Sequence, residues 1–432
     1  MKSNPIVLIP GFMGSRLSQP TDRRLFWVDP LWLPFNVGEF VNTMTLPRPS
    51  GDSLVPDGVL HDVDVGDLVR IGIYRQFHTF AISPDGLMLD PADYHEFAYD
   101  WRKSIAEAAA ALDAFLAGLP NPPITLVVHS SGGLVTAALF ALGGAGSKRV
   151  GKVVALGCPF AGLLKTIDMV EQGSGILALL FKSDPIRQLL GGWPQAYELM
   201  PSLTEPALFF DSAGNATTPF LSASVMPAGR YQQPLLSAAQ TVLSSFNLKF
   251  PVPLRLIEGF GLPTSISAKL ESGQITIQRD IQGDGTCPAR SLLAATGTGI
   301  DGQPGTRVFS LPFAEHVELV RDDAVLAYLR DDLYGAASAM QITARVKNQF
   351  ALPGTDNLLI VETRDSIGQP LGNGAPTATC TDGTKIPLAP CSVAGPARWL
   401  GRFRHPIVFT SITVTVPGLA PAQQPAPIPL IP

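Results

Sequence analysis

A serine, a carboxylate and a histidine occur in an order that supports nucleophilic catalysis. Ser130 follows the apolar run TLVVH, Asp284 lies in the turn GDGT, and His316 follows the apolar run RVFSLPF. A serine hydroxyl attacks an acyl carbon only after a neighbouring base takes its proton, and a carboxylate usually orients that base. In one class of serine enzymes the serine stands on a sharp turn between a strand and a helix, and the acid and the histidine follow later. We therefore expect Ser130 to be the nucleophile, Asp284 the acid and His316 the base.

The turn HSSGG contains two adjacent serines, so the attacking residue has to be chosen. The usual pattern is G-x-S-x-G, but Val128 stands two residues before Ser130, and His129 stands two residues before Ser131. Strand and helix approach closely at that position, where a buried valine is easier to place than a histidine. This favours Ser130. For these five residues alone, a serine that caps a helix is the competing interpretation.

Other residues compete for the two supporting roles. His405 is the other histidine well beyond Ser130, but it lies in a β-rich terminal region. A surface histidine and a non-catalytic Gly-Asp-Gly-Thr turn are the structural alternatives for His316 and Asp284. The acids that compete with Asp284 are Asp280, Asp301 and Glu258. None of them lies in so constrained a turn.

Acyl transfer also needs backbone donors for the oxyanion of the tetrahedral intermediate. The amide of Ser131, directly after the proposed nucleophile, is the first expected donor. The second is the amide of Phe12 in the segment IPGFMGS, because Gly11 permits a turn directly after the first strand.

The segments around these residues alternate between strand and helix patterns. Short apolar, β-branched runs bounded by Gly or Pro predict buried strands, and Ala- and Leu-rich runs predict helices between them. This alternation indicates a mostly parallel sheet covered by helices, an α/β fold. The predicted strands are 5–11, 125–130, 152–159, 253–260 and 307–313, and the predicted helices are 104–119, 132–144 and 322–333.

Two long insertions and a β-rich terminal region complete the predicted organisation. The insertions at about 18–80 and 163–250 are too long for plain connections and are expected to form a cap over the catalytic domain, residues 1–335. Alternating β-type segments with Gly/Pro-rich turns predict a small antiparallel β-sandwich over residues 336–418. Residues 419–432 are rich in Pro and Ala and are expected to form an extended tail.

Composition limits the partners and the setting of the protein. The net charge of −5 over 432 residues argues against general nucleic-acid binding. No apolar run approaches the length of a membrane-spanning helix, and the amino terminus lacks the pattern of a signal peptide, so we expect a cytoplasmic protein with at most peripheral membrane contact. Four cysteines are too few for a disulfide scaffold, although Cys380 and Cys391 are close enough in sequence to bridge a hairpin.

Several of these motifs together resemble the lecithin:cholesterol acyltransferase family, which includes lysosomal phospholipase A2 and phospholipid:diacylglycerol acyltransferases. The similarity covers about residues 5–330, and its motifs in order are PGFMGSRL, LFWVDPLWL with PDGV after it, YDWR, HSSGG, GCPFAG, GDGT and His316. The family usually has Met at the position of Ser131 and Val at that of Cys287. The resemblance implies an α/β-hydrolase with the roles given above for Ser130, Asp284, His316, Phe12 and Ser131. It implies nothing for the sandwich, whose protein partner is therefore unknown.

The resemblance also bears on residues outside the catalytic set. Asp100 and Arg102 of YDWR are expected to form a buried, structural pair. Trp27 and Trp32 resemble the family's interfacial segment, which contacts lipid, or else belong to the core of the cap. No metal or cofactor is expected, because HDVDVGD lacks the spacing of a calcium loop and GTGIDGQPG opens no helix after a strand.

The sequence thus predicts a serine esterase or lipase that cleaves a carboxylic ester, of a lipid or phospholipid, through an acyl-enzyme intermediate. One alternative is an acyltransferase that passes the acyl group to an alcohol. Another is a non-catalytic hydrolase fold that binds lipid or a protein.

Overall fold

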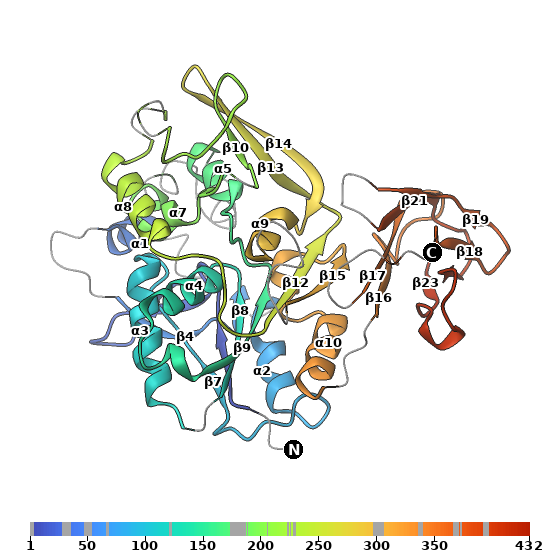
Figure 1. The fold of residues 1–432 in the computed structure, drawn as a ribbon, viewed down its shortest axis with the longest axis horizontal. Helices are drawn as coiled ribbons and strands as arrows, with labels where there is room; N and C mark the ends of the chain where they lie inside the picture. The colour runs from blue at the N-terminus through green and yellow to red at the C-terminus, as the bar shows by residue number, and fades with distance from the viewer. Residues whose placement is uncertain are drawn as a thin grey trace.

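The computed structural model describes most of the chain and is drawn in Figure 1. The described residues are 4–27, 36–46, 54–65, 69–120, 123–172, 187, 189–204, 206–222, 224, 226–227, 230–296, 306–335, 340–365, 371, 374–391 and 397–432.

A six-stranded parallel sheet forms the centre of the molecule. Its order is β15-β12-β9-β8-β1-β7, and every neighbouring pair in it is parallel. All five predicted strands are present; the short edge strand β7 was not predicted. The bounds are β1 (Ile6–Ile9), β7 (Tyr94–Glu96), β8 (Ile124–His129), β9 (Val150–Leu156), β12 (Leu254–Phe260) and β15 (Arg307–Pro312).

Both faces of this sheet are buried, which explains why its strands are almost uniformly apolar. Val7 and Ile9 belong to the core shared with helices α3 (Ile105–Gly118) and α4 (Gly132–Leu142). Ile6 and Leu8 belong to the core shared with α2 (Arg75–Ile82) and α10 (Asp323–Leu333). The three predicted helices correspond to α3, α4 and α10. Helix α2 corrects the predicted cap boundary at residue 80, because its apolar face packs on the central sheet (Figure 1).

Shorter elements form the two insertions. The first contains a three-stranded sheet and a hairpin with helix α1, and the described residues of the second contain helices α5, α7 and α8 and strands β10 and β11. The bounds are β2 (Ser15–Ser18), β3 (Leu25–Trp27), α1 (Val37–Met44), β4 (Val55–Val59), β5 (Asp62–Val65), β6 (Val69–Gly72), α5 (Leu164–Gln172), α7 (Pro194–Glu198), β10 (Phe209–Phe210), β11 (Ala216–Thr217) and α8 (Gln233–Ser244).

A long hairpin links the cap to the catalytic sheet. Strands β13 (Leu262–Glu271) and β14 (Gln274–Gly283) follow β12 directly, and β10 of the cap pairs with β13. The hairpin turns at Ser272 and Gly273, both of which have positive φ. It returns to the sheet immediately before Asp284 and is followed by the short helix α9 (Ala289–Leu293).

Two four-stranded antiparallel sheets form the end of the chain, as the alternating pattern predicts. Their orders are β16-β17-β21-β20 and β19-β18-β22-β23, and they share one apolar core. The last residues correct the predicted tail, because Ile428 and Leu430 are buried and β23 pairs with β22. The bounds are β16 (Met340–Val346), β17 (Asp356–Asp365), β18 (Thr377–Cys380), β19 (Lys385–Ile386), β20 (Leu388–Pro390), β21 (Arg398–Arg404), β22 (Thr410–Thr415) and β23 (Ile428–Leu430).

Buried ion pairs join this sandwich to the catalytic sheet. Arg398 of β21 donates to Glu258 of β12 over 2.6 Å, and its guanidinium lies 3.7 Å from the centre of the Phe260 ring. Burial alone would raise the pKa of Glu258, but the positive charges of Arg398 and Arg364 outweigh it and hold that pKa below its usual value. The two parts of the chain therefore share a desolvated contact.

None of the described helices is long and apolar enough to cross a membrane. Cys380 and Cys391 are both free thiols, so the bridge considered from their spacing is not formed.

Candidate active site

The turn between β8 and α4 presents Ser130. This residue has φ 53°, an uncommon value for a residue with a side chain, and its amide donates to the carbonyl of Leu156. Helix α4 begins two residues later and packs very closely on the next loop, because a Cβ on Gly133 would lie 2.6 Å from the Cβ of Cys158. The strained turn raises the hydroxyl above the end of the sheet, as the sequence predicts.

The structure explains why Val128 can replace the first glycine of the G-x-S-x-G pattern. Its side chain is fully buried in the core between the sheet and helices α3 and α4, and its backbone pairs with Ile9 and Ala155. The close approach of strand to helix is accommodated on the other side of the serine, at Gly132, where a Cβ would lie 2.9 Å from the carbonyl oxygen of Ile9 in β1. The departure from G-x-S-x-G is therefore compatible with the turn.

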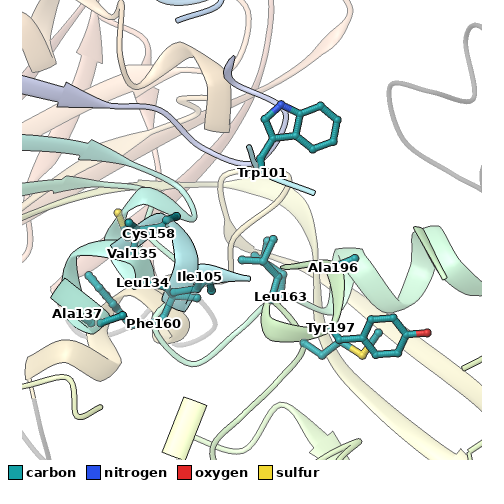
Figure 2. Close-up of a cluster of buried hydrophobic side chains, with 14 of the residues drawn as sticks. Trp101, Ile105, Leu134, Val135, Ala137, Cys158, Phe160, Leu163, Ala196 and Tyr197 are labelled. Carbon is teal, nitrogen blue, oxygen red and sulfur yellow. The ribbon is translucent and has the colours of Figure 1, made fainter. Parts of the chain in front are cut away.

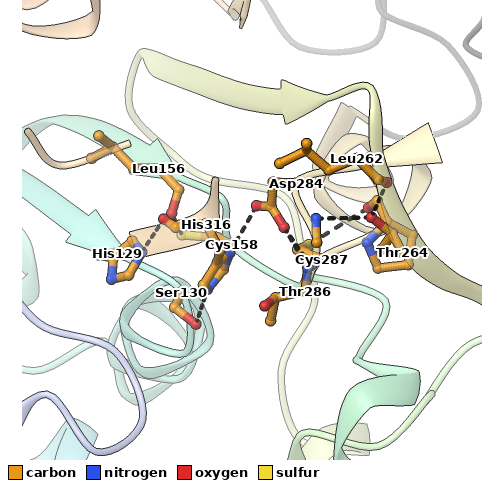
Figure 3. Close-up of polar contacts among 12 residues, drawn as sticks. His129, Ser130, Leu156, Cys158, Leu262, Thr264, Asp284, Thr286, Cys287 and His316 are labelled. Atoms are coloured by element: carbon orange, nitrogen blue, oxygen red, sulfur yellow. Dashed lines mark hydrogen bonds and ion pairs between the residues drawn. The ribbon is translucent and has the colours of Figure 1, made fainter. Parts of the chain in front are cut away.

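The three residues predicted from order lie in one hydrogen-bond chain (Figure 3). The hydroxyl of Ser130 and Nε2 of His316 are 2.9 Å apart, and Nδ1 of His316 and Oδ2 of Asp284 are 2.7 Å apart. All three residues are at most 8% exposed. This geometry allows the imidazole to take a proton from Ser130 while the carboxylate stabilises the resulting positive charge.

Backbone amides fix the carboxylate of Asp284. Its other oxygen, Oδ1, accepts from the amides of Thr286 and Cys287 over 3.0 and 2.6 Å, and its carbonyl accepts from the amide of His316 over 3.0 Å. These hydrogen bonds hold the orientation of the carboxylate toward His316. The Gly-Asp-Gly-Thr turn thus holds both the side chain of Asp284 and the backbone of His316.

The loop after β1 approaches Ser130 as expected for an oxyanion site. A Cβ on Gly11 would lie 2.6 Å from the Cβ of Ser130, so the loop reaches this position only because residue 11 is glycine. The amides of Phe12 and Ser131 donate no hydrogen bond to another described residue. Both are therefore free to donate to a developing oxyanion.

The hydroxyl of the second serine is occupied elsewhere. Oγ of Ser131 lies 2.9 Å from the hydroxyl of Tyr99, which also donates to the carbonyl of Pro10 and accepts from Gln195. Ser131 is completely buried, and burial raises the pKa of Tyr99 to about 12, so the phenol stays protonated. The contact agrees with the sequence argument that chose Ser130.

His129 and Tyr74 support the site and were not found by sequence reasoning. The Tyr74 hydroxyl accepts from the amide of Gly11 over 2.9 Å and lies 2.7 Å from Nδ1 of His129, whose Nε2 lies 3.0 Å from the carbonyl of His316. Burial, reinforced by the charge of His316, lowers the pKa of His129 to about 3, so its ring is neutral. The only consistent pattern has Tyr74 donating to Nδ1 and Nε2–H donating to His316. The position of His129 beside Ser130 was the only available signal.

Aromatic rings pack behind the oxyanion loop. The ring of Phe12 contacts Trp101 and Trp193 edge to face, and Trp101 also contacts Trp27. Figure 2 shows Trp101 in the same buried cluster as Leu134. Trp27 is 2% exposed and donates its indole N–H to the carbonyl of Met13, which favours the second of its two interpretations, a place in the core of the cap. Trp32 lies outside the described residues.

The YDWR motif has the expected buried pair. Arg102 donates to both oxygens of Asp100, over 2.9 and 2.7 Å, and the Arg102 side chain is fully buried. Arg102 also reaches the carbonyl of Thr43 in α1, which ties the first insertion to the sheet edge.

The competing residues lie elsewhere. Glu258 is engaged with the sandwich, His405 is bonded to the carbonyl of Ile431, and Asp280 accepts from the amide of Ile281. Asp301 lies outside the described residues.

One cluster among the described residues has the composition of a metal site. His61, His78 and Glu96 place their ligand atoms within 4.8 Å of one another. The Glu96 carboxylate already lies within hydrogen-bond distance of both imidazoles and accepts from Tyr94. Burial would raise the pKa of Glu96, but bonds from His61 and Tyr94 outweigh it and lower that pKa. The carboxylate is thus satisfied by protein groups alone, and the cluster is remote in sequence from the catalytic residues.

Two hollows lie near the catalytic residues. A groove of about 440 Å³ is lined by residues that include Asp284, Glu315 and His316. A second, mostly apolar pocket of about 350 Å³ lies between α4 and α8 and is lined by residues that include Leu134, Phe160, Leu243 and Phe246. Leu134 is one helical turn after Ser130.

The chain is similar in sequence and in fold to known proteins. Lysosomal phospholipase A and acyltransferase of Canis lupus familiaris is 24% identical over 379 residues, which cover 77% of this chain and 91% of the relative. The Homo sapiens protein of the same name is 23% identical and covers 77% of this chain and 90% of its own length. A solved structure described as a Tle4-Tli4 complex is 16% identical, covers 77% of this chain and 97% of its own, and superposes with a TM-score of 0.52. The chain has the α/β-hydrolase fold.

The relatives of this α/β-hydrolase confirm the resemblance to the lecithin:cholesterol acyltransferase family. No family model matches the chain. Both names contain the word lysosomal, which does not support the cytoplasmic location expected from the sequence.

Proposed function

We propose that the protein is a serine esterase that cleaves carboxylic esters of lipids through an acyl-enzyme on Ser130. The observation that carries this proposal is the unbroken hydrogen-bond chain from Ser130 through His316 to Asp284 at the carboxyl end of a parallel sheet. The names of the relatives, phospholipase A and acyltransferase, support ester chemistry at this site.

The reaction proceeds in two halves. Oγ of Ser130 attacks the acyl carbon while His316 takes its proton at Nε2, and the oxyanion accepts from the amides of Phe12 and Ser131. The carbon–oxygen bond to the alcohol then breaks, and His316 returns the proton to the leaving oxygen. Water, deprotonated by His316, attacks the acyl-enzyme in the second half and releases the acid and Ser130.

An apolar acyl group fits the surroundings of the site. The lining of the pocket between α4 and α8 includes Leu134, one helical turn after Ser130, and consists mainly of leucine and phenylalanine side chains. Burying methylene groups there would favour long acyl chains by roughly 0.8 kcal/mol for each group. We therefore place the acyl chain in this pocket.

Chain-length preference tests this placement. We expect kcat/KM on p-nitrophenyl esters to rise with acyl length, and Leu243→Trp, which fills the pocket, to reduce the ratio of long-chain to short-chain kcat/KM by about tenfold. A ratio that Leu243→Trp leaves unchanged would contradict it. A wild type that prefers the shortest esters and ignores phospholipid vesicles would overturn the lipid assignment.

Acyl transfer to an alcohol is the second candidate function. It is favoured by the names of both relatives, which include acyltransferase, and differs from hydrolysis only in what attacks the acyl-enzyme. Product analysis of a phospholipid reaction with and without a long-chain alcohol separates the two. A new ester at the expense of free acid would establish transfer.

A fluorophosphonate probe tests the catalytic assignment itself. We expect the probe to label the wild type and Ser131→Ala but not Ser130→Ala. An unlabelled wild type would favour the remaining candidate, a fold that binds lipid or protein without catalysis.

We further propose residues 1–335 as the catalytic part and 336–432 as the sandwich.

A further inference from the structure

Five large apolar side chains gather at one end of the sandwich and face solvent. They lie in the loop between β16 and β17 and in the loop between β21 and β22, and each is between 66% and 80% exposed. Elsewhere in the described chain, only Met88 is exposed to this extent among large apolar side chains outside the cap. The five residues are Phe350, Leu352, Ile407, Val408 and Phe409.

Hydrogen bonds hold the two loops side by side. Gly354 donates to the carbonyl of His405 over 2.9 Å, and His405 donates to the carbonyl of Thr355 over 2.8 Å. The strands that carry the loops are paired through Asp356 and Arg404. The apolar side chains therefore form one surface, which we call the apolar tip. Single exposed apolar residues need no explanation, but a contiguous group marks an interaction site.

Basic residues stand directly behind the apolar tip. Lys347 follows β16, and Arg402 and Arg404, two residues apart on β21, share one face of that strand. These three and a single acid, Asp356, line a shallow groove of about 450 Å³. Residues 340–432 carry seven Lys or Arg and four Asp or Glu, a net charge of +3 in a chain whose net charge is −5. The sandwich is thus the positively charged part of an acidic molecule.

The order of these groups matches the layers of a lipid surface. Apolar side chains are outermost, and flexible cationic side chains stand three to five residues away from them along the chain. A lipid surface presents hydrocarbon beneath a layer of headgroups, and anionic headgroups attract lysine and arginine at that depth.

We propose that the apolar tip docks on a lipid surface that carries anionic headgroups. Phe350, Leu352 and residues 407–409 enter the boundary between headgroups and hydrocarbon, while Lys347 and Arg402 bind the anionic groups. Docking itself does not depend on catalysis; its benefit to turnover rests on the proposed lipid esterase function. The sandwich then acts as the membrane anchor of the enzyme.

Flotation with lipid vesicles tests the proposal. The full chain carrying Ser130→Ala is used, so that lipid is not consumed, with vesicles of phosphatidylcholine alone and of phosphatidylcholine with phosphatidylglycerol. We expect binding to the anionic vesicles. The combined change Ile407→Ser, Val408→Ser and Phe409→Ser should lower the partition coefficient roughly tenfold or more. Met88→Ser, a matched exposed residue on the catalytic part, should bind like the parent protein.

A charge variant separates the two contributions. Lys347→Gln with Arg402→Gln should weaken binding to anionic vesicles by roughly 30-fold and reduce its dependence on salt, because each of the two cations near the surface contributes about 1 kcal/mol. If the variant with serine at positions 407–409 binds the anionic vesicles as well as the Ser130→Ala parent does, the proposal is overturned. A parent protein that binds neither kind of vesicle also overturns it. The same holds if the parent binds no vesicle and forms a dimer that the variant with serine at positions 407–409 does not form.

Fluorophosphonate labelling in detergent-free buffer keeps this result distinct from the proposed function. A protein that is labelled at Ser130 but does not float is an esterase without the anchor. A protein that floats but is not labelled has the anchor without the proposed chemistry.

Discussion

At the scale of single residues, the site depends on a neutral histidine beside the nucleophile. His129 connects Tyr74, and through it the amide of Gly11, to the carbonyl of His316. It touches no reacting atom, so it is a positioning residue that sets the distance between the oxyanion loop and the base. The roles of Ser130, Asp284 and His316 can be predicted from their residue types and their order in the sequence. The role of His129 depends on contacts that only folding creates.

Replacing His129 should reduce turnover without altering substrate binding. His129→Phe removes the donor to the His316 carbonyl, and a displacement of the base by about 1 Å costs on the order of 100-fold in rate. His129→Gln retains a donor and an acceptor and should recover much of the loss. Steady-state kinetics on a soluble ester give the test, with kcat lowered and KM nearly constant; equal activity of the Phe and Gln variants would refute the positioning role.

The same residue predicts how stability changes with pH. The pKa of His129 is about 3 in the folded chain and about 6.5 in an unfolded one. Between these values the unfolded state binds the extra proton, so the free energy of unfolding is highest above about pH 6.5 and falls as pH falls toward 3. Urea unfolding between about pH 7 and about pH 4 should show a shallower decline for His129→Gln than for the wild type. Parallel declines would mean that His129 titrates normally.

At the scale of elements, the sequence predicted the strands and helices that have a regular pattern of apolar residues. The five buried strands and helices α3, α4 and α10 follow from their apolar runs and flanking Gly or Pro. Hairpin β13–β14 was missed although LPTSISAKLE and QITIQRDIQG alternate and a Ser-Gly turn joins them. Helix α2 was absorbed into the predicted cap, because its eight residues lie inside a long irregular stretch. The pairing of β10 with β13 joins distant segments, which one sequence does not reveal.

The close packing of α4 on the loop after β9 gives a prediction at this scale. Gly133→Ala places a Cβ 2.6 Å from that of Cys158, and overpacking of this kind costs about 1–3 kcal/mol. The free energy of unfolding, measured by urea titration, should fall by that amount. Adding Cys158→Gly should restore part of it, and a double-mutant cycle with no coupling would show that the helix does not meet the loop here.

At the scale of the whole molecule, stability is shared across the junction between sheet and sandwich. Glu258 and Arg398 are each at most 3% exposed, and Ser310 donates to the same carboxylate oxygen as Arg398. Removing one partner of a buried pair leaves the other charge desolvated and unpaired.

Arg398→Met should therefore destabilise the whole chain by about 3–5 kcal/mol. Calorimetry should show one unfolding transition moved to lower temperature, because the lost contact belongs to both parts. Arg404→Met is the matched control: its partner Asp356 is exposed, and exposed pairs contribute about 1 kcal/mol or less. Two separate transitions in the wild type would contradict the shared stability.

The junction also decides how the protein can be divided. A chain shortened to residues 1–335 would keep Glu258 and Phe260 but lose the Arg398 that covers both, exposing a carboxylate and an apolar cluster that evolved to be hidden. Such a fragment should express poorly and aggregate, even though its catalytic triad is complete. The protein is therefore best produced with the sandwich attached, because the sandwich covers Glu258 and Phe260.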